Sequence, residues 1–220
     1  MSLTLYYHPL ASFCWKPLIA LYEHNINFIP VLVDLMNDDS RNEFLQLWPM
    51  GQFPVLKDDA SGKIIPQSTS IIEYLMLHYC KGLSLIPAEP DPALEVRRWN
   101  DFYDTYLQTP MQKIVGDCLR PESAKDPTGV NDARSTINTA YNLLEQFLNN
   151  KEWMASGIFT LADCSAAPAL FYANKVEPLD RHKNLSDYLA RLIARPSFTR
   201  VLKEAEPYFH MFPYKHQQAG

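Results

Sequence analysis

The chain has 220 residues and a formal net charge of −5, with 47% hydrophobic and 20% charged residues. These values are ordinary for a globular protein of one large domain or two small ones. The sequence shows no basic stripe, which argues against nucleic acid as a partner, and no apolar run long enough to cross a membrane. Because no basic leader precedes the first strand, we expect a reduced, cytoplasmic location.

Several common site motifs are absent from the sequence. The four cysteines have no C-x-x-C spacing, which disfavours zinc ribbons and two-cysteine redox motifs. The six histidines show no metal-ligand spacing, so we expect no metal. Neither G-x-G-x-x-G nor G-x-x-x-x-G-K occurs, which argues against dinucleotide and P-loop sites.

Residues 3–21 combine a strand, a loop and a helix start. Leu3–Tyr7 is a short apolar run that predicts a buried strand. Helical spacing begins near Ser12 or Phe13, and the first N–H groups of that helix would face the loop without partners. Such a helix start binds anions, and Ser12 and Cys14 stand there. Each also has an ordinary alternative, Ser12 as a helix N-cap and Cys14 as a small buried side chain.

The following segments predict a small α/β unit with the order β-α-β-α-β-β-α. Strands are expected at residues 28–33, 52–57 and 63–65, and helices at 40–48 and from residue 66 onwards. Pro30 marks the first of these strands as an edge strand. Ser40 with Glu43 has the pattern of a capping box.

A proline-rich segment, residues 82–92, predicts a linker. Beyond it the pattern is helical throughout, with Pro110 kinking or ending a long helix. Further helices are expected at residues 133–148, 164–172, 185–194 and 197–205, with a polar loop at 121–129. Thr160 and Asp163 form a second capping box, and the aromatic tail 206–214 should pack against the rest of the chain. We therefore expect two domains, residues 1–81 and 93–220.

Two further segments carry a chemical signal. Phe53-Pro54 at the entry of a short strand is a candidate cis bond, which would expose an edge that pairs with a peptide backbone; a plain trans proline is the alternative. Gln67 and Ser68 stand at a helix N-terminus, where a carboxylate is favoured, although Ser68 alone is typical of a cap. Together with Ser12, these segments predict a site for an anionic peptide.

The chain resembles the cytosolic glutathione transferases. The resemblance covers nearly the whole length and rests on the segments YYHPLASFCWKPLIAL, WPMGQFPVL, QSTSIIEYL and FTLADCSAAPAL, in the order and spacing of that family. It implies a thioredoxin-like α/β N-terminal domain followed by an all-α domain, and a homodimer in which each N-terminal domain meets the partner's helical domain. The sequence offers Trp48 and Phe44 as exposed apolar residues for that contact.

The resemblance also implies roles for the site residues. The loop at Ser12 would hold the sulfur of glutathione, and Phe53, before Pro54, would pair with the cysteinyl backbone. Gln67 and Ser68 would bind the γ-glutamyl carboxylate and amine. Two residues are expected close by with less defined roles: Gln52 and Trp48. Thr160 and Asp163 resemble the family's structural capping pair and belong to folding.

The chain departs from the family pattern at the activating residue. Serine-type members often carry their serine one position earlier, which here falls on Ala11. Cysteine-type members would correspond to Cys14, and tyrosine-type members to Tyr6 or Tyr7. We rank Ser12 first, Cys14 second and Tyr7 third.

Three functions follow from these alternatives. The first is conjugation of the glutathione thiolate to small hydrophobic electrophiles, a detoxification reaction. The second is a glutathione-dependent thiol–disulfide oxidoreductase that uses Cys14. The third is a non-catalytic protein that binds glutathione or hydrophobic ligands, or that serves as a protein-interaction module.

The electrophile pocket is expected between the two domains. It would be lined by helical residues, namely Tyr103, Tyr106 and Met111, and by the tail residues Phe209 and Phe212. The alternative for all of these residues is core packing at helical spacing.

Overall fold

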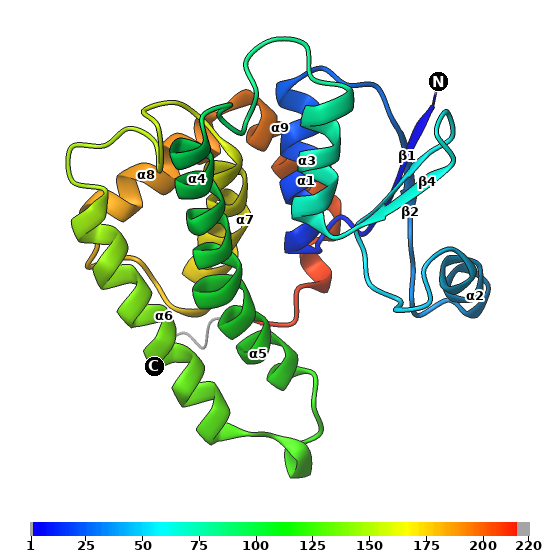
Figure 1. Cartoon of the computed structure of the whole chain (residues 1–220). Helices are drawn as coiled ribbons and strands as arrows, with labels where there is room; N and C mark the ends of the chain where they lie inside the picture. The colour runs from blue at the N-terminus through cyan, green and yellow to red at the C-terminus, as the bar shows by residue number, and fades with distance from the viewer. Residues whose placement is uncertain (1, 215–220) are drawn as a thin grey trace.

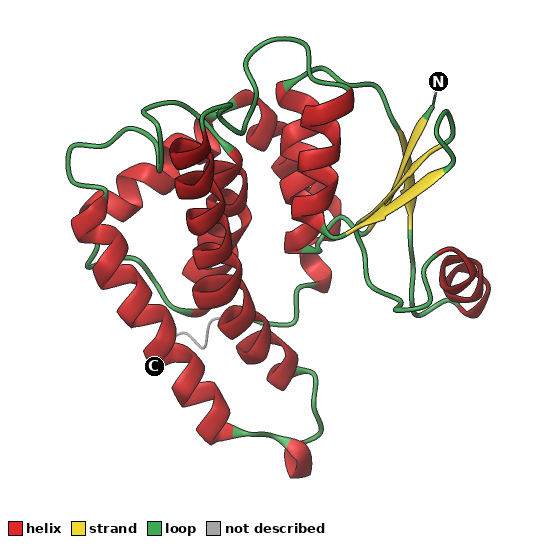
Figure 2. Cartoon of the chain, in the orientation of Figure 1, coloured by secondary structure: helices red, strands yellow, loops and turns green. Residues whose placement is uncertain are grey.

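The computed structural model describes residues 2–214 and divides them between a sheet-containing part and a helical part (Figures 1 and 2). Residue 1 of the predicted first domain and residues 215–220 of the predicted second domain lie outside this range. The elements of the first part are β1 (Leu3–Tyr7), α1 (Ser12–Glu23), β2 (Ile29–Leu32), α2 (Asp38–Leu47), β3 (Val55–Asp58), β4 (Lys63–Pro66) and α3 (Ser68–His78). The predicted order of strands and helices is confirmed.

The four strands form a mixed sheet in the order β2-β1-β3-β4. β1 is parallel to β2 and antiparallel to β3, and Leu5 opposite Leu56 is fully buried. Pro30 lies on the edge strand β2 as predicted, opposite Leu5 of β1; an edge strand tolerates the missing N–H of proline. Helices α1 and α3 cover the face of the sheet that is turned to the helical part, and α2 lies on the other side (Figure 1).

The predicted cap of helix α2 at Ser40 is wrong. Its N-cap is Asn37, whose Oδ1 accepts a hydrogen bond from the Ser40 N–H at 3.0 Å. The Ser40 hydroxyl accepts instead from the Asp34 N–H at 3.0 Å. Asn caps a helix as well as Ser does, and the earlier start places Asp38 and Asp39 in the first turn, where the helix dipole favours acids.

The second part is helical throughout. Its elements are α4 (Pro90–Tyr103), the π-helical turn η1 (Asp104–Gln108), α5 (Thr109–Cys118), the short η2 (Glu122–Ala124), α6 (Pro127–Phe147), α7 (Leu161–Val176), α8 (Lys183–Ala194), α9 (Pro196–Ala205) and the 3₁₀ turn η3 (Glu206–Met211). Helix α4 begins at Pro90, inside the stretch predicted as a linker. Helix α6 begins at Pro127, inside the stretch predicted as a loop, because Asp126 caps it by accepting from the Gly129 N–H at 2.9 Å.

The long helix is interrupted at η1, in agreement with the kink or helix end that was predicted at Pro110. Pro110 cannot donate a backbone hydrogen bond, and the chain passes through a π-helical turn immediately before α5. Such turns are rare and are frequent at functional sites.

Helix α7 is the centre of the fold, packed against both α1 and α4. The predicted capping box is confirmed: Asp163 Oδ2 accepts from the Thr160 N–H at 2.8 Å and from its hydroxyl at 3.0 Å. Oδ1 of the same buried carboxylate accepts from the Met154 N–H and the Tyr188 hydroxyl. These bonds tie three segments of the helical part together, which supports the structural assignment of the pair.

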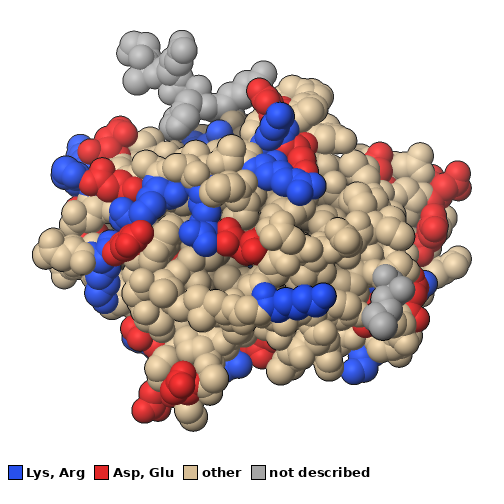
Figure 3. Space-filling view, turned by 90° about the horizontal axis from the view of Figure 1, so that it is seen from above, with Lys and Arg blue, Asp and Glu red and all other residues tan. Residues whose placement is uncertain are grey.

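The aromatic tail packs against the core as predicted. Phe209 stacks on Phe171 with 5.8 Å between ring centroids, and Phe212 lies 5.3 Å from Tyr172. Acidic and basic side chains lie among one another on the face drawn in Figure 3. No helix in the described range is long and apolar enough to span a membrane.

Candidate functional site

A pocket of about 340 Å³ opens where the N-terminal ends of α1 and α3 meet the loop before β3. Its lining residues come from both parts of the chain: Phe13, Trp48, Gly51, Gln52, Phe53, Pro54, Gln67, Ser68 and Gln112. The structure therefore brings together the segments of Gln52, Phe53-Pro54 and Gln67-Ser68 that the sequence singled out, and it adds Gln112 from α5.

Ser12 is the first residue of α1 and adjoins the pocket residue Phe13. The N-cap position belongs to Ala11, which has no side chain to cap with, so the expected N-cap alternative for Ser12 does not hold. Its side chain is nearly buried, with 5% of the residue exposed. The Cys14 N–H donates to the Ala11 carbonyl at 2.8 Å, whereas the N–H groups of Ser12 and Phe13 have no partner within the helix. The pocket lining includes Phe13 but not Ser12, so the Ser12 hydroxyl lies beside the pocket.

Cys14 is completely buried and does not line the pocket. Burial raises the pKa of its thiol to about 12, although a hydrogen bond with the His8 backbone lowers it in part. A reactive cysteine needs an accessible, electropositive setting that lowers its pKa. The structure therefore disfavours Cys14 as the active group and places it in the core, the alternative stated for it.

The tyrosines of β1 do not line the pocket. Burial raises the pKa of Tyr7, and Glu204 and Tyr208 raise it further. Tyr6 packs against Phe44 with 6.2 Å between ring centroids. Both side chains have the packing role that strand residues ordinarily have.

The Phe53–Pro54 peptide bond is cis, as the sequence suggested. Gly51 turns the chain into this loop with a positive φ of 62°, a conformation that suits glycine. The Phe53 ring lies between Phe44 and His8, with centroid distances of 6.2 and 6.0 Å. The loop is thus held from both sides by ring contacts.

Gln67 and Ser68 stand where predicted, at the N-terminus of α3. Gln67 adopts a positive φ of 71°, which is unusual for a residue other than glycine and costs free energy. Its side chain makes no capping hydrogen bond, so its amide is not used to hold the helix end. The first turn contains no acidic residue, and the positive end of the helix dipole therefore favours an anion from outside.

The residues predicted for the electrophile side do not line this pocket. Tyr103 is fully buried and donates to the Met154 sulfur at 3.1 Å, and Met111 is only 3% exposed. Tyr106 is exposed and belongs to a separate groove between α4 and α6, with Phe102 and Leu143. Helical spacing correctly indicated helical backbone at these three positions, which lie on α4, η1 and α5, but the residue of α5 that lines the pocket is Gln112.

Two aromatic neighbours of the pocket were not predicted. His8 stacks on Phe53, and Tyr208 from the tail lies edge-on to His8 at 6.4 Å. Nδ1 of His8 accepts from the Leu10 N–H at 3.2 Å. Burial lowers the pKa of His8, while Asp34 raises it to a smaller extent, so the ring is neutral near pH 7. The His8-Pro9 dipeptide marked the strand end in the sequence, but no local signal joins it to Tyr208.

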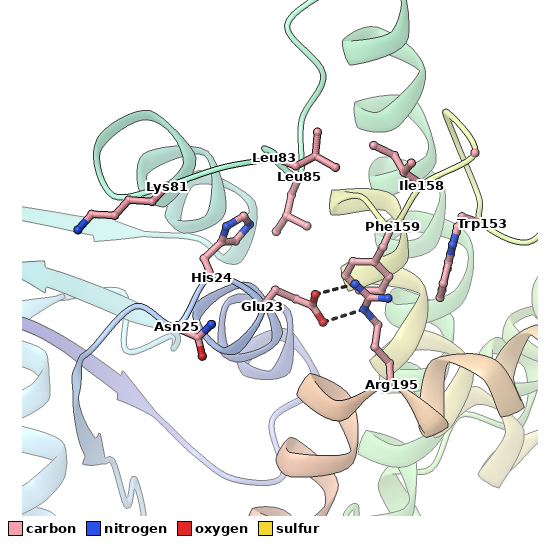
Figure 4. Close-up of a pocket in the computed structure, with 11 residues that line it drawn as sticks. Glu23, His24, Asn25, Lys81, Leu83, Leu85, Trp153, Ile158, Phe159 and Arg195 are labelled. Carbon is pink, nitrogen blue, oxygen red and sulfur yellow. Dashed lines mark hydrogen bonds and ion pairs between the residues drawn. The ribbon is translucent and has the colours of Figure 1, made fainter.

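A larger crevice of about 460 Å³ lies at the other end of α1 (Figure 4). Glu23 and Arg195 close it with two hydrogen bonds of 2.7 Å each. The Arg195 guanidinium lies 3.9 Å from the Phe159 ring centroid and 5.2 Å from that of Trp153. The charges of Glu23 and Arg195 are thus paired with each other, whereas within residues 2–214 the buried Nε2 of His24, which also lines the crevice, has no hydrogen-bond partner. Within residues 2–214 there is no cluster of three or more His, Cys, Asp or Glu side chains that could hold a metal.

Comparison with known proteins agrees with this architecture. The model of the glutathione S-transferase N-terminal domain matches residues 5–80, and that of the glutathione S-transferase C-terminal domain matches residues 107–196. The chain therefore belongs to the glutathione S-transferase family.

Individual relatives are distant. Glutathione S-transferase GstB of Escherichia coli is 24% identical over 192 residues, covering 85% of this chain and 91% of that protein. Protein LigF of a Sphingobium species is 37% identical over 109 residues, but the match spans only 49% of this chain and 42% of LigF. A crystal structure of a Methylobacillus flagellatus glutathione S-transferase with glutathione bound shares the fold, with a TM-score of 0.83, 24% identity, and coverage of 90% of this chain and 98% of that one.

Proposed function

We propose that the protein is a glutathione S-transferase that joins the glutathione thiolate to small hydrophobic electrophiles. The observation that carries the proposal is the pocket in which the start of α1, the cis-proline loop and the start of α3 converge. The glutathione that is bound in the Methylobacillus flagellatus relative supports the choice of cosubstrate.

Each wall of the pocket suits one part of the tripeptide. Gln67 and Ser68, with the N-terminus of α3, suit the γ-glutamyl carboxylate and amine because that helix end offers N–H groups and a positive dipole. The backbone of Phe53 suits the cysteinyl residue in strand-like pairing. Gln52 and Trp48 line the same wall and complete the peptide side.

The thiol would then lie near the start of α1. A free thiol with a pKa of about 8.5 is mostly protonated at neutral pH. The Ser12 hydroxyl and the N–H groups of Ser12 and Phe13 would stabilise the thiolate, and each unit of pKa lowering is worth about 1.4 kcal/mol. The sulfur forms a bond to the electrophilic carbon while the leaving group departs with its electron pair, so the protein activates a nucleophile that belongs to its cosubstrate.

The electrophile side is apolar and aromatic. Phe13 lines the pocket directly. Tyr208 contacts His8, and His8 in turn stacks on the pocket residue Phe53. Planar aromatic electrophiles suit such a wall because stacked and edge-on ring contacts add to apolar burial. This arrangement replaces the expected lining by Tyr103, Tyr106 and Met111.

We also propose a cytoplasmic homodimer between the N-terminal part of one chain and the helical part of its partner. Trp48 remains a candidate for this contact because it is partly exposed, whereas Phe44 is buried in its own chain, with 2% exposed, and does not contribute. The exposed groove with Tyr106 and Leu143 offers apolar area on the helical side.

Two assays test the proposed function. Calorimetric titration with reduced glutathione should show saturable binding, and addition of chlorodinitrobenzene should show conjugation above the uncatalysed rate. Binding without conjugation of a panel of aromatic electrophiles would favour the non-catalytic alternative. Formation of a mixed disulfide between Cys14 and glutathione would favour the oxidoreductase.

A further inference from the structure

Lys16 on α1 is a fully buried lysine at the junction of the two parts. Its ammonium has three hydrogens to donate, and it meets three oxygens: Asp104 Oδ2 at 2.6 Å, Asn100 Oδ1 at 2.9 Å and Thr69 Oγ1 at 3.2 Å. Burial lowers the pKa of Lys16, and Asp104 opposes that effect. We refer to Lys16, Thr69, Asn100 and Asp104 as the Lys16 network.

The Lys16 network joins the start of α3 to the helical part. Thr69 is the second residue of α3 and follows Ser68 directly. Its hydroxyl lies 3.2 Å from Asn100 Oδ1 on α4, and the same oxygen accepts from Ser165 of α7 at 2.6 Å. Three helices of the fold are therefore fixed to the helix end that lines the pocket.

The Lys16 network also contacts residues and elements that line the pocket. The Phe13 ring, which lines the pocket, has its centroid 5.7 Å from the Lys16 ammonium. Asp104 begins the π-helical turn that leads into α5, the helix of the pocket residue Gln112. The pocket residues Phe13, Ser68 and Gln112 thus belong to elements that the network holds in place.

Stability alone does not account for these polar residues. A buried ion pair is often no more stabilising than apolar residues of the same volume. Within residues 2–214, Asp104 Oδ1 and both amide atoms of the fully buried Gln108 have no hydrogen-bond partner, and unpaired buried polar atoms are destabilising. A junction built for stability would contain fewer such groups.

We propose that Lys16 is a positioning residue for glutathione, which holds the start of α3 in its binding geometry through Thr69 and couples it to the helical part. This inference rests on the proposed function. Without the Thr69 contact, the N–H groups next to Gln67 and Ser68 lose their fixed orientation toward the γ-glutamyl carboxylate. Glutathione then binds less tightly, while the chemistry of the bound thiolate is unchanged.

Thr69→Val removes the hydroxyl with little change of shape, and Thr69→Ser keeps it. The glutathione Kd and KM of Thr69→Val should rise about tenfold, because the hydroxyl loses both the charge-assisted hydrogen bond from Lys16 and the one that it donates to Asn100, while kcat at saturating glutathione stays within about twofold. Thr69→Ser should behave like the wild type. Lys16→Met should show the same split where it folds, and Thr69→Val carries the test where it does not.

Glu23→Gln is the matched control, because Glu23 also lies on α1 and pairs with the helical part, yet it is outside the pocket. It should lower the thermal midpoint and leave the glutathione Kd unchanged. The inference is overturned if Thr69→Val lowers only the thermal midpoint, or if Glu23→Gln weakens glutathione as much as Thr69→Val does. Failure of the wild type to bind glutathione would overturn the proposed function itself, and this inference with it.

Discussion

The two ends of helix α1 both face the helical part, but they differ in whether their charged and hydrogen-bonding groups have partners within the protein. At the C-terminal end, Glu23 is paired with Arg195 and also accepts from the Ser197 hydroxyl, so the carboxylate that lines the crevice there has partners within the protein (Figure 4). At the N-terminal end, the helix start near Ser12 and the uncapped start of α3 keep donors available. The helix starts at the N-terminal end are therefore the better site for the carboxylates of a peptide, because the N–H groups of a helix start and its dipole favour an anion, whereas the crevice at the other end already contains the Glu23 carboxylate.

The substitution with the largest expected effect on activity is Ser12→Ala, at the N-terminal end of α1. Loss of the hydroxyl should lower kcat/KM for chlorodinitrobenzene about 10²-fold, as removal of a single donor to a developing or full negative charge typically does. The glutathione Kd should change little, since the peptide side of the pocket is intact. If Ser12→Ala kept the wild-type kcat/KM, the backbone N–H groups alone would stabilise the thiolate and the Ser12 hydroxyl would have no part in it.

The start of α3 provides the second test. Ser68→Ala should weaken glutathione binding about tenfold, because a hydrogen bond to a charged group is worth about 1.5–3 kcal/mol. Thermal stability should stay close to that of the wild type, since the Ser68 side chain is not needed to close the helix. Calorimetry with glutathione measures the first quantity and a thermal scan the second; an unaltered Kd would remove Ser68 from the site.

Glu23→Gln tests the closed end of the helix for stability. Loss of the partly exposed ion pair with Arg195 should lower the free energy of unfolding by about 1–3 kcal/mol, as measured by urea denaturation. Conjugation activity below the melting range should stay that of the wild type. A large loss of activity in the folded variant would mean that the two ends of α1 are not independent.

Cys14→Ala should have the smallest effect on catalysis. The buried thiol is protonated at neutral pH because burial raises its pKa to about 12, so activity should stay within about twofold of the wild type. Its unfolded pKa is about 8.5. The folded state therefore loses stability as pH rises from about 8.5 towards about 12, and Cys14→Ala should flatten that decline in denaturation curves. Alkylation of native Cys14 at neutral pH would contradict this account.

Local signals in the sequence predicted much of the fold. Pro30 identified the edge strand, and Thr160 with Asp163 identified the start of α7, because these residues restrict the backbone or satisfy it locally. The cap at Ser40 was wrong since several residues nearby can cap, and only the folded chain shows that Asn37 does so.

The site was predictable only where it is built from helix and strand ends. Gln67, Ser68 and Phe53 were found in this way, and they meet in one pocket. Met111 and Gln112 are neighbours in the sequence, yet Met111 is buried in the core and Gln112 lines the pocket, and periodicity does not say which side of α5 meets a pocket and which the core. Tyr208 joins the site only through a long-range contact with His8, which no local pattern records.

The central claim is that the start of α1, and not a cysteine, ionises glutathione. The most direct measurement is a pH titration of the ultraviolet absorbance of the thiolate in the glutathione complex, for the wild type, Ser12→Ala and Cys14→Ala. We predict a bound thiol pKa well below the free value of about 8.5 in the wild type and in Cys14→Ala, and a rise of about one to two units in Ser12→Ala. A bound thiol that titrates like free glutathione, or a shift that disappears only in Cys14→Ala, would contradict the account.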